Sequence, residues 1–220
     1  MPVSKMPNIV VLISGSGSNL QAILDACEAG EIPGRIAAVI SNRPNAYGLE
    51  RARLAGVAAH VIDHTEFESR EAFDQQLQQC IDEYQPSLVV LAGFMRILTE
   101  GFTQHFLGRM INIHPSLLPK YPGLNTHQRA IDAGDAEHGA TVHFVTPVLD
   151  DGPNIIHAKV AIDESDSAEA LANKVHGIEH KIYPKAVEWF AAGRIAMGDD
   201  GRAYLDNTLL DESGIDLASL

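Results

Sequence analysis

The sequence predicts an α/β fold, with a doubly wound, mainly parallel sheet and an antiparallel hairpin in the C-terminal half. In the first half of the chain, short β-branched runs alternate with helical patterns, which is typical of a parallel sheet covered by helices on both faces. In the second half, two strand-like runs are separated by a turn, which indicates an antiparallel pair. Because parallel crossovers are right-handed, a doubly wound, Rossmann-like sheet is the simplest topology.

The first half contains five predicted strands and three predicted helices. The strands are residues 8–13, 36–41, 58–62, 87–92 and 110–113, and the helices are residues 19–29, 47–55 and 69–84. In the last of these helices, Phe73, Leu77 and Ile81 recur at helical spacing, so this helix presents an apolar stripe to the core.

The second half begins with the hairpin, formed by residues 139–146 and 155–162 around a turn that contains Gly152 and Pro153. A helix is expected after Ser167, because serine is a favoured N-cap residue. Pro184 is expected to kink that helix or to start a new segment that runs to Ala192.

Short strands are expected around Ile195 and at residues 203–205. We expect a single domain over residues 1–220, with a core at about 8–193, a leader at 1–7 and an acidic tail at about 198–220. Residues 199–216 hold six acids and one base, a pattern typical of a solvated terminus.

Composition excludes several classes of protein. The chain has 220 residues, with 16 Lys and Arg against 29 Asp and Glu, so its formal net charge is −13. That acidic balance argues against a nucleic-acid partner. The longest aliphatic runs hold five residues, whereas a membrane-spanning helix needs about 20. The first residues lack the apolar core of a signal peptide, so we expect a cytoplasmic protein without a membrane partner.

A glycine-containing loop, Ser14 to Asn19, lies between the first strand and the first helix. Small residues allow a ligand to approach the backbone, and a helix N-terminus attracts anions. The loop lacks the lysine of a nucleotide-triphosphate loop, and no acid follows the second strand to bind a ribose diol. The two interpretations left open are a monophosphate site and a plain tight turn.

Two polar side chains, Asn112 and His114, occupy one face of the strand that Pro115 ends. Open α/β sheets bind ligands at the carboxyl ends of their strands. Asn112 can donate to a developing oxyanion and His114 can move a proton at neutral pH, so this pair indicates catalysis rather than a structural histidine.

A carboxylate would orient the ring of His114 and favour its protonated form. Asp150 is the best candidate, and Asp151 is an alternative that spacing cannot separate from it. We expect no metal, because the histidines lack the spacing of a zinc site. Cys27 and Cys80 fall on helical patterns and indicate packing rather than a disulfide or a nucleophile.

Five motifs in this order make the chain resemble the folate-dependent phosphoribosylglycinamide formyltransferase family of purine biosynthesis, over residues from about 8 to about 193. The motifs are VVLISGSGSNLQAI, VVLAGFMRIL, INIHPSLLPKYPG, HGATVHFVTPVLDDGPNI and EHKIYP. The resemblance implies formyl transfer from 10-formyltetrahydrofolate, a co-substrate, to the amino group of glycinamide ribonucleotide. It implies no metal and small-molecule partners only.

The resemblance also implies roles for residues. The catalytic residues would be Asn112, His114 and Asp150. The ribonucleotide site would comprise Gly17, Ser18, Asn19, His176, Gly177, Ile178 and Glu179. The folate site would comprise Arg70, Met95, Arg96, Ile97, Leu98, Asn112, Thr146, Pro147, Val148, Leu149 and Asp150.

Three other functions are alternatives to this formyl transfer. Formyltetrahydrofolate hydrolase resembles the chain less, because a regulatory N-terminal domain is missing. Methionyl-tRNA formyltransferase would suit a basic surface and a further C-terminal domain. A nucleotide-binding sensor would leave Asn112 and His114 without a purpose. Oligomeric state is expected to be a monomer or a homodimer.

Overall fold

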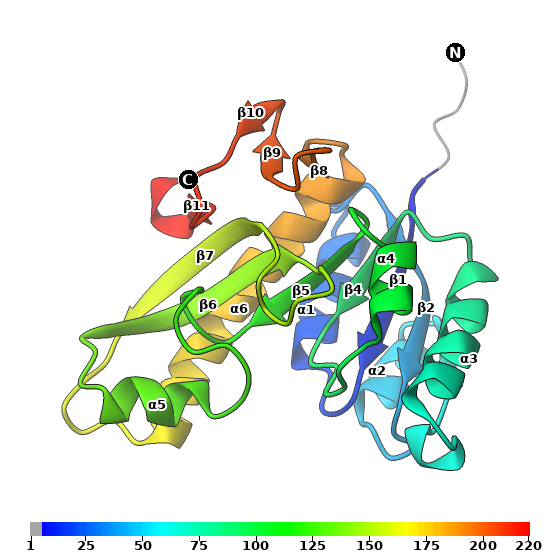
Figure 1. Cartoon of the computed structure of the whole chain (residues 1–220), viewed down its shortest axis with the longest axis horizontal. Helices are drawn as coiled ribbons and strands as arrows, with labels where there is room; N and C mark the ends of the chain where they lie inside the picture. The colour runs from blue at the N-terminus through cyan, green and yellow to red at the C-terminus, as the bar shows by residue number, and fades with distance from the viewer. Residues whose placement is uncertain (1–5) are drawn as a thin grey trace.

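The computed structural model describes residues 6–220, so the first five residues of the expected leader lie outside the described part. Two sheets organise the chain: an eight-stranded sheet in the order β11-β7-β6-β5-β4-β1-β2-β3 and a three-stranded sheet in the order β10-β9-β8 (Figure 1). The strands of the first half are β1 Asn8–Ile13, β2 Arg35–Ser41, β3 Ala58–Val61, β4 Leu88–Leu91 and β5 Met110–His114. Those of the second half are β6 Glu137–Phe144, β7 Asn154–Ala161, β8 Ile195–Met197, β9 Ala203–Leu205, β10 Thr208–Leu209 and β11 Ile215–Asp216.

Strand directions confirm the predicted fold class. The first five strands are parallel to one another, and the antiparallel hairpin of β6 and β7 pairs with β5 through β6, which runs antiparallel to it. The pairing of β5 with β6 places Asn112 opposite His143 and His114 opposite Thr141. The register therefore brings two histidines and an asparagine together at one end of the sheet.

Helices cover both faces of the large sheet. They are α1 Ser18–Glu28, α2 Gly48–Leu54, α3 Arg70–Asp82, α4 Glu100–His105, α5 Thr126–Asp132 and α6 Ala168–Ala191, with single turns at His64–Glu66 and Leu217–Ser219. Side chains alternate along β1: Val11 belongs to the core under α1 and α6, and Val10 belongs to the core under α3 and α4. Each face of the sheet thus has its own core.

One of the two outcomes expected at Pro184, the start of a new segment, was wrong. The helix runs without a break from Ala168 to Ala191 with Pro184 inside it, so no new segment starts there. Proline removes one hydrogen bond from the helix, but the buried neighbours Tyr183 and Val187 hold α6 on the sheet. The hydroxyl of Tyr183 also donates to the main-chain carbonyls of Leu91 and Ile111, at 2.8 and 3.2 Å.

The acidic tail differs from the expected solvated terminus. Its strand β11 adds to the large sheet parallel to β7, as the red segment beside β7 shows (Figure 1). Asp216 lies 3.5 Å from both His157 and Lys159 of β7, so β7 places a histidine and a lysine beside this acid. The expected short strands near Ile195 and at 203–205 are present as β8 and β9. No helix among residues 6–220 combines the length and apolarity needed to span a bilayer.

Candidate active site

A cavity of about 1090 Å³ opens where β1, β4 and β5 end. It brings together most of the residues that the sequence singled out, although they come from distant parts of the chain. Those on its wall are Gly17, Ser18, Asn19, Met95, Arg96, Ile97, Leu98, Asn112, His114, Thr146, Pro147, Val148, Leu149, Asp150, His176 and Glu179. Arg70, Gly177 and Ile178 do not line it: Arg70 is exposed at the start of α3, Gly177 is exposed on α6, and Ile178 packs against the core.

His114 is buried between two acceptors. Its Nδ1 lies 3.5 Å from a carboxylate oxygen of Asp150, and its Nε2 donates to the main-chain carbonyl of Tyr121 at 2.8 Å. The same carboxylate oxygen of Asp150 accepts from the backbone N–H of Gly123 at 2.8 Å. Asp151 is exposed, so the geometry separates the two aspartates and selects Asp150 as the partner of His114.

The loop before α1 packs against the start of a second helix, α2. Gly17 has φ 70°, and a side chain there would meet the Cα of Gly48 at 2.6 Å, so only glycine fits. Gly48 at the start of α2 donates its N–H to the carbonyl of Gly15, and Arg51 Nε donates to the carbonyl of Ser16. The carbonyls of Gly15 and Ser16 thus accept hydrogen bonds from α2.

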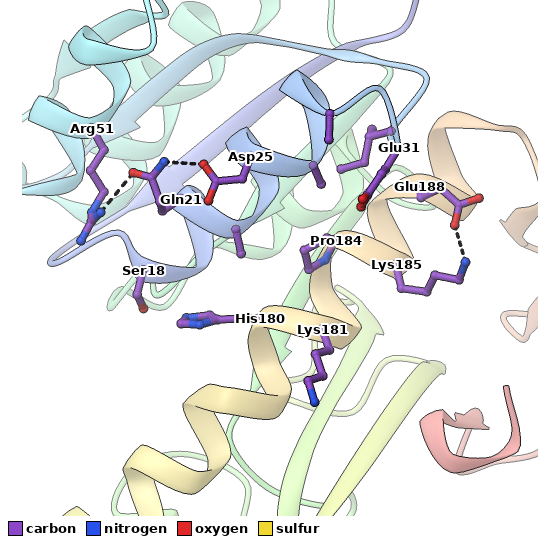
Figure 2. Close-up of a pocket in the computed structure, with 14 residues that line it drawn as sticks. Ser18, Gln21, Asp25, Glu31, Arg51, His180, Lys181, Pro184, Lys185 and Glu188 are labelled. Carbon is purple, nitrogen blue, oxygen red and sulfur yellow. Dashed lines mark hydrogen bonds and ion pairs between the residues drawn. The ribbon is translucent and has the colours of Figure 1, made fainter.

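Figure 2 shows the outer side of this loop, where a groove runs between α1 and α6. Arg51 contacts Gln21 of α1 at 3.1 Å, and Gln21 contacts Asp25 at 2.8 Å. Ser18 lines both this groove and the larger cavity, so the loop separates the two. Arg51 therefore supports the loop from outside the cavity.

Glu179 of α6 forms the floor beside the loop. It is 4 % exposed and accepts from the side-chain amide of Asn19 at 2.8 Å. Burial raises the pKa of Glu179, while the Asn19 hydrogen bond and His176 act in the opposite direction. The side-chain oxygen of Asn19 is buried with no hydrogen-bond partner, so this polar atom is left for a ligand or a water molecule.

The other end of the cavity has an apolar rim. Met95, Ile97, Val148 and Leu149 are all more than half exposed there. Arg96 stacks over the ring of Phe73 at 4.7 Å, and its Nε is buried without a partner. A cluster of exposed apolar side chains at a cavity is typical of a site for a flat or apolar ligand group.

Some residues of the cavity were missed by the sequence analysis. The segment from Gly123 to His127 lines it, and Thr126 Oγ1 is buried there without a partner. His127 also lies on this wall. Its Nδ1 lies 3.2 Å from His138 Nε2, and burial lowers its pKa to about 4. Among residues 6–220, no group of three or more His, Cys, Asp or Glu side chains is arranged to hold a metal ion.

Comparison with known proteins identifies the family. The model of the formyl transferase family matches residues 7–187. The chain belongs to the formyl transferase family. Within this family it is 55 % identical to phosphoribosylglycinamide formyltransferase of Escherichia coli, over 94 % of this chain and 97 % of that protein. It is 40 % identical to the human trifunctional purine biosynthetic protein adenosine-3, over 90 % of this chain and 20 % of that protein.

A solved structure agrees with these matches. Phosphoribosylglycinamide formyltransferase of Coxiella burnetii is 53 % identical and superposes with a TM-score of 0.92, covering 96 % of this chain and 99 % of that one. The match to the E. coli formyl transferase spans 207 residues, so it is longer than the segment 8–193 and extends beyond it. The expectation that the likeness excludes both leader and tail was therefore wrong, and the chain is placed among the phosphoribosylglycinamide formyltransferases.

Proposed function

We propose that this chain transfers a formyl group from 10-formyltetrahydrofolate to the amino group of glycinamide ribonucleotide, a step of purine biosynthesis. One observation carries the proposal: Asn112, His114 and Asp150 lie together in a cavity that has a phosphate-type loop at one end and an apolar rim at the other. The names of the relatives support it. The proposal includes one cytoplasmic domain that acts as a monomer or homodimer on small molecules.

The proposed reaction passes through a tetrahedral intermediate. The amine nitrogen attacks the formyl carbon, and the carbonyl electrons move to the oxygen, which becomes an oxyanion. Asn112 donates an N–H to that oxyanion, and His114 supplies a proton to N10 of the folate as the carbon–N10 bond breaks. The attacking nitrogen gives up one proton to water, and water returns a proton to His114, so charge and atoms balance. No covalent bond to the protein forms.

The phosphate end of the ribonucleotide is assigned to the loop. Backbone N–H groups of Gly17, Ser18 and Asn19 at the start of α1 would bind the phosphate, since a helix N-terminus favours anions. Glu179 and His176 face the same end of the cavity. Gly177 and Ile178 are left out of the proposed site, because neither lines the cavity.

The folate is assigned to the apolar rim. Residues 95–98 and 146–150 enclose that end, and the buried Nε of Arg96 offers a donor to an anionic or carbonyl group. Arg70 lies outside the cavity wall, so any role at the folate site would be at its outer edge.

An acceptor-substitution assay tests the function. The pure protein is mixed with 10-formyltetrahydrofolate and one of three acceptors: glycinamide ribonucleotide, its riboside without the phosphate, or water alone. We expect tetrahydrofolate to be released at a substantial rate only with the ribonucleotide. Release that is independent of the acceptor would indicate a hydrolase. Equal rates with the riboside would contradict the phosphate assignment.

Substitution of the catalytic residues tests the mechanism. Asn112→Ala and His114→Ala should each lower kcat by ~10² or more, because an oxyanion donor or a proton donor is lost. Circular dichroism and the melting temperature show whether each variant folds. Wild-type turnover in either folded variant would refute the assignment.

A further inference from the structure

The contacts of His143 point to a role that neither the motifs nor the relatives assign. His143 lies on β6, directly opposite Asn112 of β5, and its side chain is 2 % exposed. Its Nε2 lies 3.2 Å from the side-chain nitrogen of Asn112, and its Nδ1 lies 2.8 Å from the main-chain carbonyl of Phe144. Both ring nitrogens are therefore engaged by a neighbour.

These two contacts fix the protonation pattern of the ring. A carbonyl only accepts, so the proton of a neutral ring must be on Nδ1, where it is donated to Phe144. Nε2 is then an acceptor. It can pair with the NH₂ group of Asn112 but not with its carbonyl oxygen. The orientation of the Asn112 amide thus follows from the chemistry of the His143 ring.

The surroundings keep the ring in this neutral form. Burial lowers the pKa of His143 to about 4, and the nearby His114 acts in the same direction. Asp150 acts in the opposite direction, but its carboxylate is 3.9 Å from Nε2, too far for a hydrogen bond. These are the two charged or titratable groups that face the ring, and at neutral pH it remains an acceptor.

We infer that His143 is a positioning residue that holds the Asn112 amide with its nitrogen toward β6 and its second N–H directed to the formyl oxygen. The inference rests on the proposed function, in which Asn112 stabilises the oxyanion. An unrestrained asparagine rotates easily about its last torsion. Its carbonyl oxygen would then face the oxyanion and repel it. His143 borders the same cavity and excludes that orientation through its contact with Asn112.

A matched pair of variants tests this role. His143→Gln keeps an acceptor near the position of Nε2, whereas His143→Leu has a similar size and no acceptor. We expect His143→Leu to lower kcat by about 10-fold or more, with the KM of both substrates changed by less than about threefold. His143→Gln should recover most of the lost kcat. Equal losses in both variants, or an unchanged kcat in His143→Leu, would overturn the inference.

Two controls separate positioning from a structural effect. His157 of β7 is also a buried strand histidine whose Nδ1 contacts a carbonyl, that of Ser213, but it lies away from Asn112. His157→Leu should lower the melting temperature and leave kcat unchanged. In an Asn112→Ala background, His143→Leu should cause little further loss of kcat. A full additional loss would show that His143 acts independently of Asn112.

A measurement on the wild-type protein does not depend on whether a variant folds. Nitrogen-15 NMR of histidine-labelled protein at pH 7 should show His143 with a proton on Nδ1 and none on Nε2. A protonated Nε2 would overturn the inference. If the wild type shows no ribonucleotide-dependent transfer, the proposed function is refuted. The NMR result would still show whether Nε2 of His143 accepts the hydrogen bond from Asn112.

Discussion

Asp150 and Asp151 are neighbours in sequence but lie in different surroundings. The side chain of Asp150 is 7 % exposed and faces His114, whereas Asp151 is exposed. Asp150 has φ 52°, a left-handed conformation that turns its side chain inward. Strand alternation assigned the faces of Asn112 and His114 from the sequence, but no such rule applies in a turn, so the sequence left the two aspartates unresolved.

Amide substitution at these two positions distinguishes their roles. Asp150→Asn should lower kcat by ~10², because His114 loses the negative charge beside its Nδ1 while the acceptor for Gly123 is kept. Asp151→Asn is the matched control and should retain wild-type kcat. Steady-state kinetics with both substrates measure the difference. A larger loss at Asp151 would reverse the assignment.

The helix α2 packs directly against the glycine-containing loop, Ser14 to Asn19, at Gly48. A side chain at Gly48 would meet the end of the Ile13 side chain at 2.5 Å and the Cα of Gly17 at 3.2 Å, so the buried Ile13 side chain or α2 has to shift beside the loop. Gly48→Ala should therefore raise the KM for the ribonucleotide by about tenfold or more, since small displacements are costly at a binding site. The KM for the folate should change little.

Gly101→Ala serves as the control for Gly48. Gly101 lies in the helix α4 with open space around its Cα, and its backbone does not need glycine. Alanine there should stabilise the protein by ~0.5–1 kcal/mol and leave both KM values unchanged. If Gly48→Ala behaves in the same way, the loop does not depend on α2.

Strand β11 contains an acid, Asp216, whose pKa is lowered in the folded chain. The N–H of Ala218 lowers the pKa of Asp216 most, and the nearby His157 and Lys159 lower it further, so the folded state favours the ionised carboxylate. A lowered folded-state pKa contributes stability above the unfolded pKa, and that stability is lost as the pH falls through the folded value. At pH 7, Asp216→Asn should lower the free energy of unfolding by about 1 kcal/mol.

Urea unfolding measures this change. Asp211→Asn is the control, because the side chain of Asp211 is exposed in the same tail. As the pH falls below the unfolded value of 3.8 and through the lowered folded pKa of Asp216, the difference between Asp216→Asn and the wild type should shrink and disappear. An equal effect of both substitutions at pH 7 would indicate that net charge alone is responsible.

Most strands and helices were predictable from the sequence, and the exceptions include α4, α5 and the pairing of β11. The five parallel strands, the hairpin and the helix α3 followed from continuous runs or helical spacing. The helices α4 and α5 hold six and seven residues and were not predicted, although α2, also of seven residues, was. The pairing of β11 with β7 depends on long-range contacts of Asp216, which local patterns do not contain.

The protonation of two histidines, His127 and His143, is linked to the stability of the whole molecule. The pKa values of His127 and His143 are lowered to about 4, chiefly by burial. In the unfolded chain these groups titrate near 6.5. The unfolded state therefore binds more protons as the pH falls below 6.5, so the stability that is present above that value declines toward pH 4.

A series of urea unfolding curves between pH 7 and pH 4 tests this linkage. The free energy of unfolding should decline over that range, and His127→Gln should flatten the decline. His105→Gln is the control, because His105 is a surface residue beside Asp82. An unchanged slope in His127→Gln would show that His127 does not contribute.

The net charge of −13 belongs to the surface of the molecule rather than to the cavity. Both proposed substrates are anionic, so the overall field does not attract them. Local groups must supply the attraction, and the loop N–H groups at Gly17, with Arg96 at the opposite end, are placed to do so.

The strand order has a consequence for how the chain emerges from the ribosome. On one side β1 pairs with β2, but its other neighbour is β4, which is synthesised only after β2, β3 and α3. Until then one edge of β1, an entirely apolar strand after Asn8, has no partner. Unpaired apolar edges promote aggregation, and distant pairings fold slowly. Synthesis of the N-terminal half is thus the stage at which this apolar edge is open to aggregation.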